Sequence, residues 1–518
     1  MQQPALLKAA YRFMANGRVS HASLSQPHWQ QTRQVAGQQP CVLLVQDGTE
    51  LDYTHYGRTM AGLGVVGTGR FASGLLLHTT LGIVPGSRQV LGLLHQQVHR
   101  RHLIPPGTHR RQRPKAERES RVWGEALRAI GGPPAGVRWV VVADRGADDI
   151  TFLLTCQAQG CDVNLRIRQN RRLITEDGSV RYLLPTVRAW PEQVRKTVDI
   201  RGRGGRPARQ ATVAVSYGQV QVRIKPQQGD SLALWIVRAW EATPPADGEA
   251  LEWLLATTVP VATAADALER LDWYTARWLV EDYHQCLKTG CAIEQRDFEE
   301  AVRIERLLGF LAIVAVRLLQ LRESARQEPN APALATVAPL FVHLLAAKLR
   351  LAGNTITLRQ FWRGVAQLGG FRGRRSDGDP GWKTLWAGWL QLEALADGAR
   401  LAAQLEATTA ILRVQDEQLR LAHERVRIGQ ASPDEALSLQ AQAEQTRAEL
   451  PALRKQLQQT EHLLAVLTGR APSKGDIPAF TLADFTLPVE MPLVVPSELV
   501  RRRPDIQASE ALLHAANA

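Results

Sequence analysis

Residues 138–150 read RWVVVADRGADDI, and this stretch decides the fold class. Its run of β-branched and aromatic residues is typical of a central, buried strand that ends at Asp144. Further apolar runs at residues 42–45, 71–79 and 89–95 predict additional strands. Because helical patterns alternate with these runs, the first part of the chain is expected to be α/β.

Residues 165–258 have a different character. Alternating runs separated by Gly and Gln predict antiparallel strands at residues 213–217, 220–224 and 232–237. Between residues 166 and 225 there are 14 Lys/Arg and 4 Asp/Glu, so this β segment is strongly basic. Helical patterns resume near Ala264 and continue to Leu395, with a glycine-rich interruption at 369–381.

The whole chain is basic, with a net charge of +13 over 518 residues and a pI near 9.9. Such a balance makes a polyanion the first partner to consider, and both nucleic acid and an anionic membrane surface fit. Five scattered cysteines argue against a disulfide scaffold and fit a reducing cytosol. The longest apolar run, residues 307–316, is too short to span a bilayer. We therefore expect a cytoplasmic protein that does not associate with membranes.

Residues 404–518 have a different composition from the rest. They carry 12 basic and 15 acidic side chains, a net charge of −3, and all 13 tryptophans lie at or before Trp389. Helical periodicity predicts a hairpin of two helices, residues 401–430 and 433–467, in which Pro451 should kink or break the second. An extended segment after residue 472 and a short helix from about residue 504 are expected to follow.

Three acidic residues could form one site. Asp47 closely follows an apolar run, Asp144 ends the central strand, and Glu281 lies on a predicted helix over residues 272–288. Carboxylates from two strand ends and a helix can meet at one sheet edge and bind Mg²⁺ or Mn²⁺, as phosphoryl transfer requires. Helical spacing places four residues on one face: Tyr274, Arg277, Glu281 and Lys288. The alternative interpretation of this pattern is an ordinary solvated face with an Arg/Glu pair four residues apart. Strand-end aspartates are also common caps.

Other constellations give weaker signals. The cysteine pairs have C-x4-C spacing, unusual for zinc, and are better read as small buried residues: Cys156 with Cys161 and Cys286 with Cys291. Three histidines at helical spacing lie beside a predicted strand end and a basic loop, and are read as solvated polar residues: His95, His99 and His102. The basic segment 100–115 holds six Lys/Arg and no acid, as expected of a surface that follows DNA.

The pattern Y-x2-R-x3-E-x6-K within WYTARWLVEDYHQCLKTG, together with VQDGTELDYTHY, VVVADRGADDI, FLAIVAVRLLQLRESA and GWKTLWAGW, resembles transposases of the insertion-sequence-four family, transposon-five type. The resemblance covers about residues 5–402. It implies an RNase H-like catalytic core interrupted by an antiparallel β insertion and followed by helical segments. It also implies a homodimer that synapses transposon ends and inserts them into target DNA.

The resemblance assigns roles residue by residue. Asp47, Asp144 and Glu281 would be both the catalytic residues and the metal ligands. Tyr274, Arg277 and Lys288 would contact DNA phosphates, joined by Arg166, for which Arg168 is a near alternative. Trp253 would receive a flipped base, unless it is a plain core tryptophan. The implied chemistry is hydrolysis that frees a 3′-hydroxyl, formation and reopening of a hairpin, and strand transfer.

The tail resembles a different family. ERVRIGQASPDEALSLQAQ, LAVLTGRAP and PSELVRRRPDIQASEALLHAANA look like part of a TolC/NodT-type outer-membrane efflux protein. The expected organisation is a remnant of a DNA-binding domain (1–40), a core in two parts (41–164 and 259–328) around the basic β insertion (165–258), a helical transposase region (329–402) and an efflux-like fragment (403–518).

The chain departs from the transposase pattern in three ways. Only the final stretch of the usual N-terminal domain precedes Asp47, Gln285 replaces a frequent lysine, and the C-terminal helices run into foreign sequence near Ala402. The sequence therefore leaves three hypotheses open: an active transposase, a DNA-binding inhibitor or inactive remnant of one, and an efflux-related helical scaffold.

Overall fold

The chain folds into two compact units, Gln2–Leu392 and Glu393–Ala518. The computed structural model describes residues 4–56, 59–67, 72–101, 120–175, 179, 181–200, 209–224, 231–243, 250–351, 356–374 and 376–468. Several predictions fall outside these residues: most of the basic segment 100–115, with His102, the extended segment after residue 472, and the helix from about residue 504.

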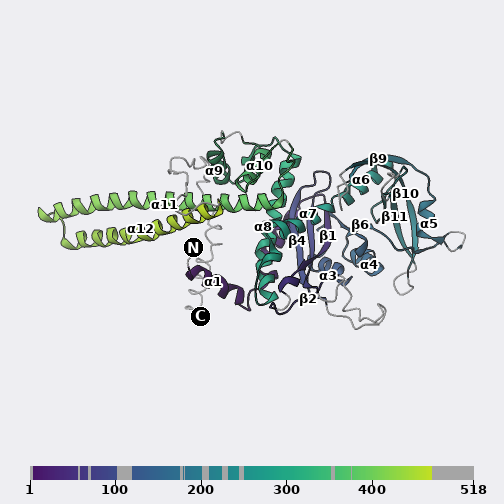
Figure 1. The fold of residues 1–518 in the computed structure, drawn as a ribbon, viewed down its shortest axis with the longest axis horizontal. Helices are drawn as coiled ribbons and strands as arrows, with labels where there is room; N and C mark the ends of the chain where they lie inside the picture. Colours follow the sequence, from purple (N-terminus) through teal and green to yellow (C-terminus); the bar gives the residue numbers. More distant parts are fainter. Residues whose placement is uncertain are drawn as a thin grey trace. The chain divides into compact units, whose positions relative to one another are not determined.

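Within the described residues of the first unit, twelve strands form a single mixed sheet (Figure 1). The order is β2-β3-β1-β5-β6-β12-β11-β10-β7-β8, with β4 paired to β3 and β9 paired to β10. The strands are β1 Cys41–Asp52, β2 Gly64–Val65, β3 Ser73–Ile83, β4 Val90–His99, β5 Arg138–Ala143, β6 Asp162–Arg166, β7 Arg172–Leu173, β8 Arg181–Tyr182, β9 Val194–Ile200, β10 Arg209–Arg223, β11 Ser231–Glu241 and β12 Glu252–Thr257.

The centre of the sheet is parallel. β5 pairs with β1 on one side and with β6 on the other, both in parallel register. Its residues Trp139 to Ala143 are buried, as expected of a strand covered on both faces. The prediction of a central strand in RWVVVAD is confirmed, and so is the α/β class.

The basic β segment continues the same sheet. β12 pairs antiparallel with β6, and β11 and β10 follow outward from it. The prediction of separate strands at 213–217 and 220–224 is wrong, because β10 runs unbroken through Gly218. Gly218 lies in the strand beneath Trp190, and a Cβ there would approach the indole to 3.0 Å. This glycine makes room for a ring rather than a turn.

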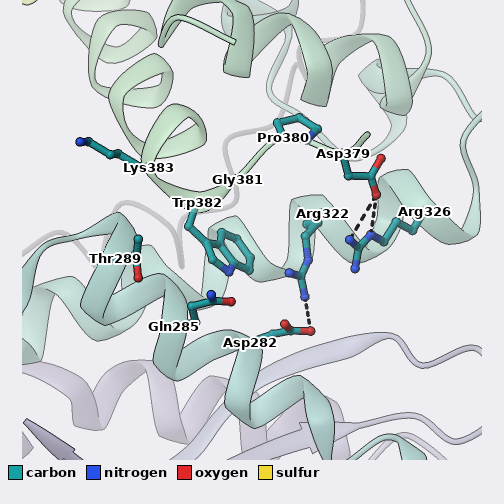
Figure 2. A pocket seen from close by; sticks show the side chains of 10 residues that line it. All are labelled: Asp282, Gln285, Thr289, Arg322, Arg326, Asp379, Pro380, Gly381, Trp382 and Lys383. Carbon is teal, nitrogen blue, oxygen red and sulfur yellow. Dashed lines mark hydrogen bonds and ion pairs between the residues drawn. The ribbon is translucent and has the colours of Figure 1, made fainter. Parts of the chain in front are cut away.

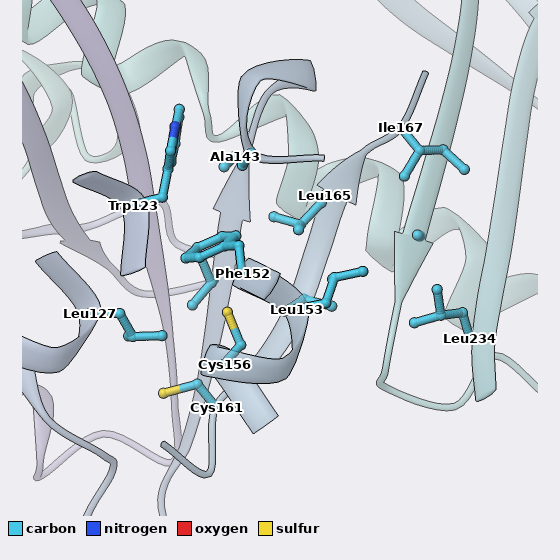
Figure 3. Close-up of a cluster of buried hydrophobic side chains, with 14 of the residues drawn as sticks. Trp123, Leu127, Ala143, Phe152, Leu153, Cys156, Cys161, Leu165, Ile167 and Leu234 are labelled. Carbon is cyan, nitrogen blue, oxygen red and sulfur yellow. The ribbon is translucent and has the colours of Figure 1, made fainter. Parts of the chain in front are cut away.

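Helices cover both faces of the central strands. On one face, α3 and α4 contribute Trp123, Leu127, Phe152 and Leu153 to a buried hydrophobic cluster (Figure 3). On the other side, α7 contacts β1 and β3, while α2 and α8 contact β4. The helices of this unit are α1 Pro4–Ala15, α2 His21–Ala36, α3 Arg121–Ile130, α4 Ile150–Ala158, α5 Leu183–Arg188, α6 Ala264–Thr275, α7 Trp278–Gln285, α8 Ala301–Gln327, α9 Pro339–Leu349 and α10 Leu358–Leu368.

The second unit contains the predicted helical hairpin. α11 (Trp382–Arg427) and α12 (Pro433–Leu467) are joined at Gly429, which has a positive φ of 74° and permits the reversal. α11 starts well before residue 401, so the compositional boundary near residue 400 is not the end of a helix. α12 continues through Pro451, and the predicted break there is wrong. The neighbouring Leu450 and Leu453 are buried, and this packing offsets the local cost of the proline.

Two glycines of the GWKTLWAGW segment give a test of packing between α10 and α11. A Cβ at Gly388 would lie 1.7 Å from the carbonyl oxygen of Val365, whereas nothing lies within 4 Å of a Cβ at Gly381. We expect Gly388→Ala to lower the free energy of unfolding by about 2 kcal/mol or more, and Gly381→Ala to change it by less than about 0.5 kcal/mol. Urea unfolding followed by tryptophan fluorescence measures both, because every tryptophan lies within Gln2–Leu392. Equal stability of the two variants would contradict this close contact.

Candidate active site

Asp47 and Asp144 come from neighbouring parallel strands. The register pairs Val45 of β1 with Val142 of β5, so the two aspartates are each two residues further on and lie side by side. Adjacent strands are about 4.8 Å apart. Leu44 and Ala143 belong to the cluster under α3 and α4. Because successive side chains alternate between faces, Asp47 and Asp144 project from the opposite face, toward the side of α7.

The position of Asp47 differs from the prediction. It was expected just beyond a strand, yet β1 continues to Asp52. The extension arises from the antiparallel partner, since β3 pairs with β1 from Leu43 through Asp52 and opposes Thr79 to Asp47. Asp144 does follow its strand, and its Oδ1 accepts the backbone N–H of Gly146 at 2.7 Å. A Cβ at Gly146 would meet that oxygen at 2.9 Å, so glycine suits this turn.

The predicted helix over residues 272–288 is not continuous. α6 ends at Thr275, α7 covers Trp278–Gln285, and a π-helical turn follows at Cys286–Gly290. Around Arg277 the backbone bonds run three residues back rather than four, which tightens the chain and starts a new helix. The prediction of one continuous helix is therefore wrong. Arg277 nevertheless lies beside the Tyr274 ring, at 5.9 Å, and pairs with Glu281 one turn further on, as the predicted spacing required.

Arg277 links two of the three acidic residues. Its Nη1 donates to Asp47 Oδ2 at 2.8 Å, and its Nη2 forms an ion pair with Glu281 Oε1. The Arg277 side chain is only 8% exposed, whereas that of Glu281 is 40% exposed. The guanidinium also lies 5.0 Å from the centre of the Trp278 ring. The guanidinium of Arg277 thus binds an acidic side chain of β1 and one of α7 at the same time.

The electrostatics of Asp47 show that the three acids influence one another. Burial raises the pKa of the Asp47 carboxyl to about 6, and although Arg277 opposes this rise, Asp144 and Glu281 add to it. Asp144 and Glu281 therefore lie near enough to influence the charge of Asp47, although burial is the larger cause of the rise in its pKa. Across the described residues, however, no three His, Cys, Asp or Glu side chains are arranged so that they could hold a metal ion.

The other predicted DNA-binding residues surround this centre at different depths. Arg166, at the end of β6, is half-buried and donates to the carbonyl of Glu252 at 3.0 Å, while Arg168 is exposed. Lys288 is 30% exposed and lies 3.4 Å from Glu294. Trp253 is packed edge-on against the buried Tyr274, with ring centres 5.7 Å apart. This is the packing of a core tryptophan, and its base-binding role stays a prediction.

Sequence reasoning missed a buried polar network beside α7. Gln96 of β4 donates to Thr79 of β3 at 3.0 Å and to the hydroxyl of Tyr283 at 2.9 Å, and His21 contacts its oxygen. His284 reaches the same Thr79 hydroxyl at 3.0 Å. The only available signal was polar residues inside otherwise apolar strands. The network fixes the helix of Glu281 against the sheet.

The alternative zinc sets are not assembled in the described part of the chain. Cys156 and Cys161 belong to the hydrophobic cluster of Figure 3, and burial raises the pKa of both thiols. His95 is partly buried, and burial lowers its pKa to about 4, so its reading as a solvated residue is wrong.

A separate cavity of about 560 Å³ is lined by Asp282 and Gln285 of α7 together with residues of α8 and the start of α11 (Figure 2). Arg322 lies in it between Asp282, at 2.6 Å, and the ring of Trp382, at 4.3 Å. Arg326 pairs with Asp379 across its mouth at 3.2 Å. These contacts join α7, α8 and the start of α11, and they give the cavity a structural role in holding α7.

Comparison with known families gives two matches to this chain. Residues 118–317 match the family model of the transposase DDE domain, which supports assignment to the DNA transposases. Residues 342–409 match the transposase Tn5 dimerisation domain. Together the two matches support a Tn5-like DDE transposase, a class that suggests nuclease and transesterase chemistry and a dimer acting on DNA. The second match extends past residue 402, where foreign sequence was expected to begin.

Among the described helices, none combines the length and the apolar character needed to cross a membrane.

Proposed function

We propose that this chain cleaves DNA at transposon ends and joins the freed 3′ ends to target DNA, with Asp47, Asp144 and Glu281 as its catalytic carboxylates. The observation that carries the proposal is that Asp47 on β1 and Asp144, directly after the neighbouring parallel strand β5, face the side of α7, where Arg277 links Asp47 to Glu281. The finer assignments belong to the same proposal: the insertion-sequence-four family with its Y-R-E-K pattern, the RNase H-like core and its β insertion, and the synaptic homodimer.

The donor chemistry fits a divalent cation. Three carboxylates supply the hard oxygen ligands that Mg²⁺ and Mn²⁺ prefer. Burial is the main cause of the raised pKa of Asp47, and a bound cation would offset the smaller contribution of repulsion from Asp144 and Glu281. When bound, the cation would activate a water molecule and stabilise charge on the phosphate. The protein's part would be to bring the three carboxylates together around the cation, while Lys288 and Arg166 would bind strand phosphates.

Lys288, a proposed phosphate-binding residue, already has an acidic partner. Lys288 pairs with Glu294, whose Oε1 also accepts the backbone N–H of Asp52 at 2.9 Å. DNA binding would replace a partly exposed ion pair of small worth by a phosphate contact. Binding is therefore expected to weaken steeply as salt rises.

Cleavage of labelled DNA tests the proposal. The full chain is incubated with Mg²⁺ or Mn²⁺ and duplexes carrying the terminal sequences that flank its gene, and nicks are resolved on denaturing gels. We expect Asp144→Asn to reduce nicking by ~10³-fold or more, and chelation of the metal to abolish it. Asp149→Ala is the matched control. Asp149 lies five residues after Asp144 and caps the start of α4, so this variant is expected to nick DNA like wild type.

DNA binding without nicking, in wild type and Asp144→Asn alike, would support the inhibitor instead. An efflux-related origin for residues 403–518 stays a prediction, and it would be supported by an interrupted efflux reading frame in the flanking DNA.

A further inference from the structure

The proposed role of the site leaves one feature unexplained: the guanidinium of Arg277 lies between two of its carboxylates. Asp47 and Glu281 are 234 residues apart in sequence, and in the described chain they share the guanidinium of Arg277. A cation that bridges the two acids needs the same oxygen atoms. Two cations cannot occupy one bridging position, so the arginine and the metal ion exclude each other there.

We propose that Arg277 closes the metal site in the absence of DNA, and that a DNA phosphate opens it by taking the guanidinium. This inference rests on the proposed function and adds to it an order of events: the divalent cation binds tightly only after DNA. Arg277 is thereby a positioning residue that makes metal binding depend on the substrate.

The setting of Arg277 supports a switch between two partners. Its two Nη atoms reach carboxylates, yet its Nε–H is buried and has no hydrogen-bond partner among the described residues. A buried donor without a partner costs free energy, so the clamp on the acids is not an optimal site for this side chain. A planar guanidinium binds phosphate through two parallel hydrogen bonds, which a DNA strand beside the site offers.

Local structure permits the exchange. Arg277 lies at the junction where α6 ends and α7 begins, and its partner Glu281 is 40% exposed. Release of Arg277 therefore frees Glu281 at the surface without unpacking the strands. By linkage, DNA must raise metal affinity by the same factor by which the metal raises DNA affinity.

Mn²⁺ binding provides a test that does not depend on turnover. Free Mn²⁺ is measured by electron paramagnetic resonance during titration of the full chain, with and without a terminal-sequence duplex. The same titration of Asp144→Asn with that duplex corrects for Mn²⁺ held by the DNA itself. We expect DNA to tighten Mn²⁺ binding by wild type about tenfold or more.

Two arginine variants complete the test. Arg277→Met is expected to bind Mn²⁺ without DNA about tenfold more tightly than wild type, and to show no further gain with DNA. Arg270→Met is the matched control. Arg270 is similarly buried, stacks on Trp273 at 3.9 Å and pairs with Glu269, but it forms no ion pair with any of the three proposed ligands among the described residues. It should behave as wild type.

The outcomes separate the two proposals. If DNA-free wild type binds Mn²⁺ as tightly as it does with DNA, the gating role of Arg277 is wrong, although Asp144→Asn would still abolish binding. If Asp144→Asn binds Mn²⁺ like wild type in every state, the metal site itself is wrong. The wild-type comparison with and without DNA decides the question even if Arg277→Met fails to fold.

Discussion

Lowering the pH from 7 to 5 is expected to reduce the free energy of unfolding of the first unit by several kcal/mol. Burial lowers the pKa of His78 and His284 to about 3, and that of His28 and His95 to about 4, from an ordinary value of 6.5. The unfolded chain therefore binds more protons than the folded chain below pH 6.5. The folded state therefore loses stability as the pH falls from about 6.5 toward the folded-state pKa values of about 3 to 4, and it does not suffer this loss well above pH 6.5.

The magnitude follows from proton linkage. Each of these histidines costs about 2 kcal/mol at pH 5, so four of them cost on the order of 7 kcal/mol. Asp47 acts in the opposite direction, because its raised pKa of about 6 lets the folded state take up a proton first, which returns about 1 kcal/mol. The net loss of about 5–6 kcal/mol is comparable with the whole stability of an ordinary domain.

At His28 a hydrogen bond adds to the effect of burial. His28 Nε2 accepts the backbone N–H of Leu93 at 3.1 Å, which a protonated ring cannot do. Urea unfolding at pH 7, 6 and 5, followed by tryptophan fluorescence, measures the effect. His284→Gln should flatten the pH dependence by about 2 kcal/mol, whereas replacing His423, which is exposed on α11, should not. A stability loss below about 2 kcal/mol by pH 5 would rule this account out.

Asp148→Ala is expected to destabilise the first unit by about 3–5 kcal/mol. Asp148 is 3% exposed and forms an ion pair with Arg171, which is also buried. Its Oδ2 accepts the backbone N–H groups of Arg168 and Gln169, each at 2.8 Å. Removal of the carboxylate leaves a buried cation and two backbone donors without their acceptor.

Asp149 offers a control one residue away. It is half-buried and caps α4 through the backbone N–H of Thr151 at 2.7 Å, so Asp149→Ala should cost only about 1 kcal/mol. Denaturant unfolding of both variants gives the difference directly. Because Asp148 also fixes the turn after β6, loss of its contacts should weaken the placement of Arg166. Similar stabilities for the two variants would show that the buried ion pair is replaceable.

Local sequence patterns predicted an element correctly wherever the burial of its own side chains determines the structure. The run in RWVVVAD is buried on both sides and became β5, and the spacing of apolar residues in the tail became a hairpin. The errors lie where a distant partner decides. β1 extends past Asp47 because β3 pairs with it, and β10 passes through Gly218 because a tryptophan lies over that glycine.

The candidate site shows the same division. Residue types and spacing single out Asp47, Asp144 and Glu281, because carboxylates at strand ends and in a helix are visible in sequence. Nothing in the sequence indicates that Arg277 lies at the junction of two helices and contacts Asp47, because that contact joins residues 230 positions apart. Nor could periodicity reveal the buried contacts of Gln96 and His284.

Propensity, charge and periodicity are local properties, so they were enough to predict the α/β class, the basic character and the helical hairpin, and to nominate three acidic residues as candidates. Only the tertiary structure decided that the basic β segment continues the central sheet, that the acids face α7, and that an arginine holds two of them. Those features depend on strand register and on ion pairs between distant residues, which form only when the chain has folded.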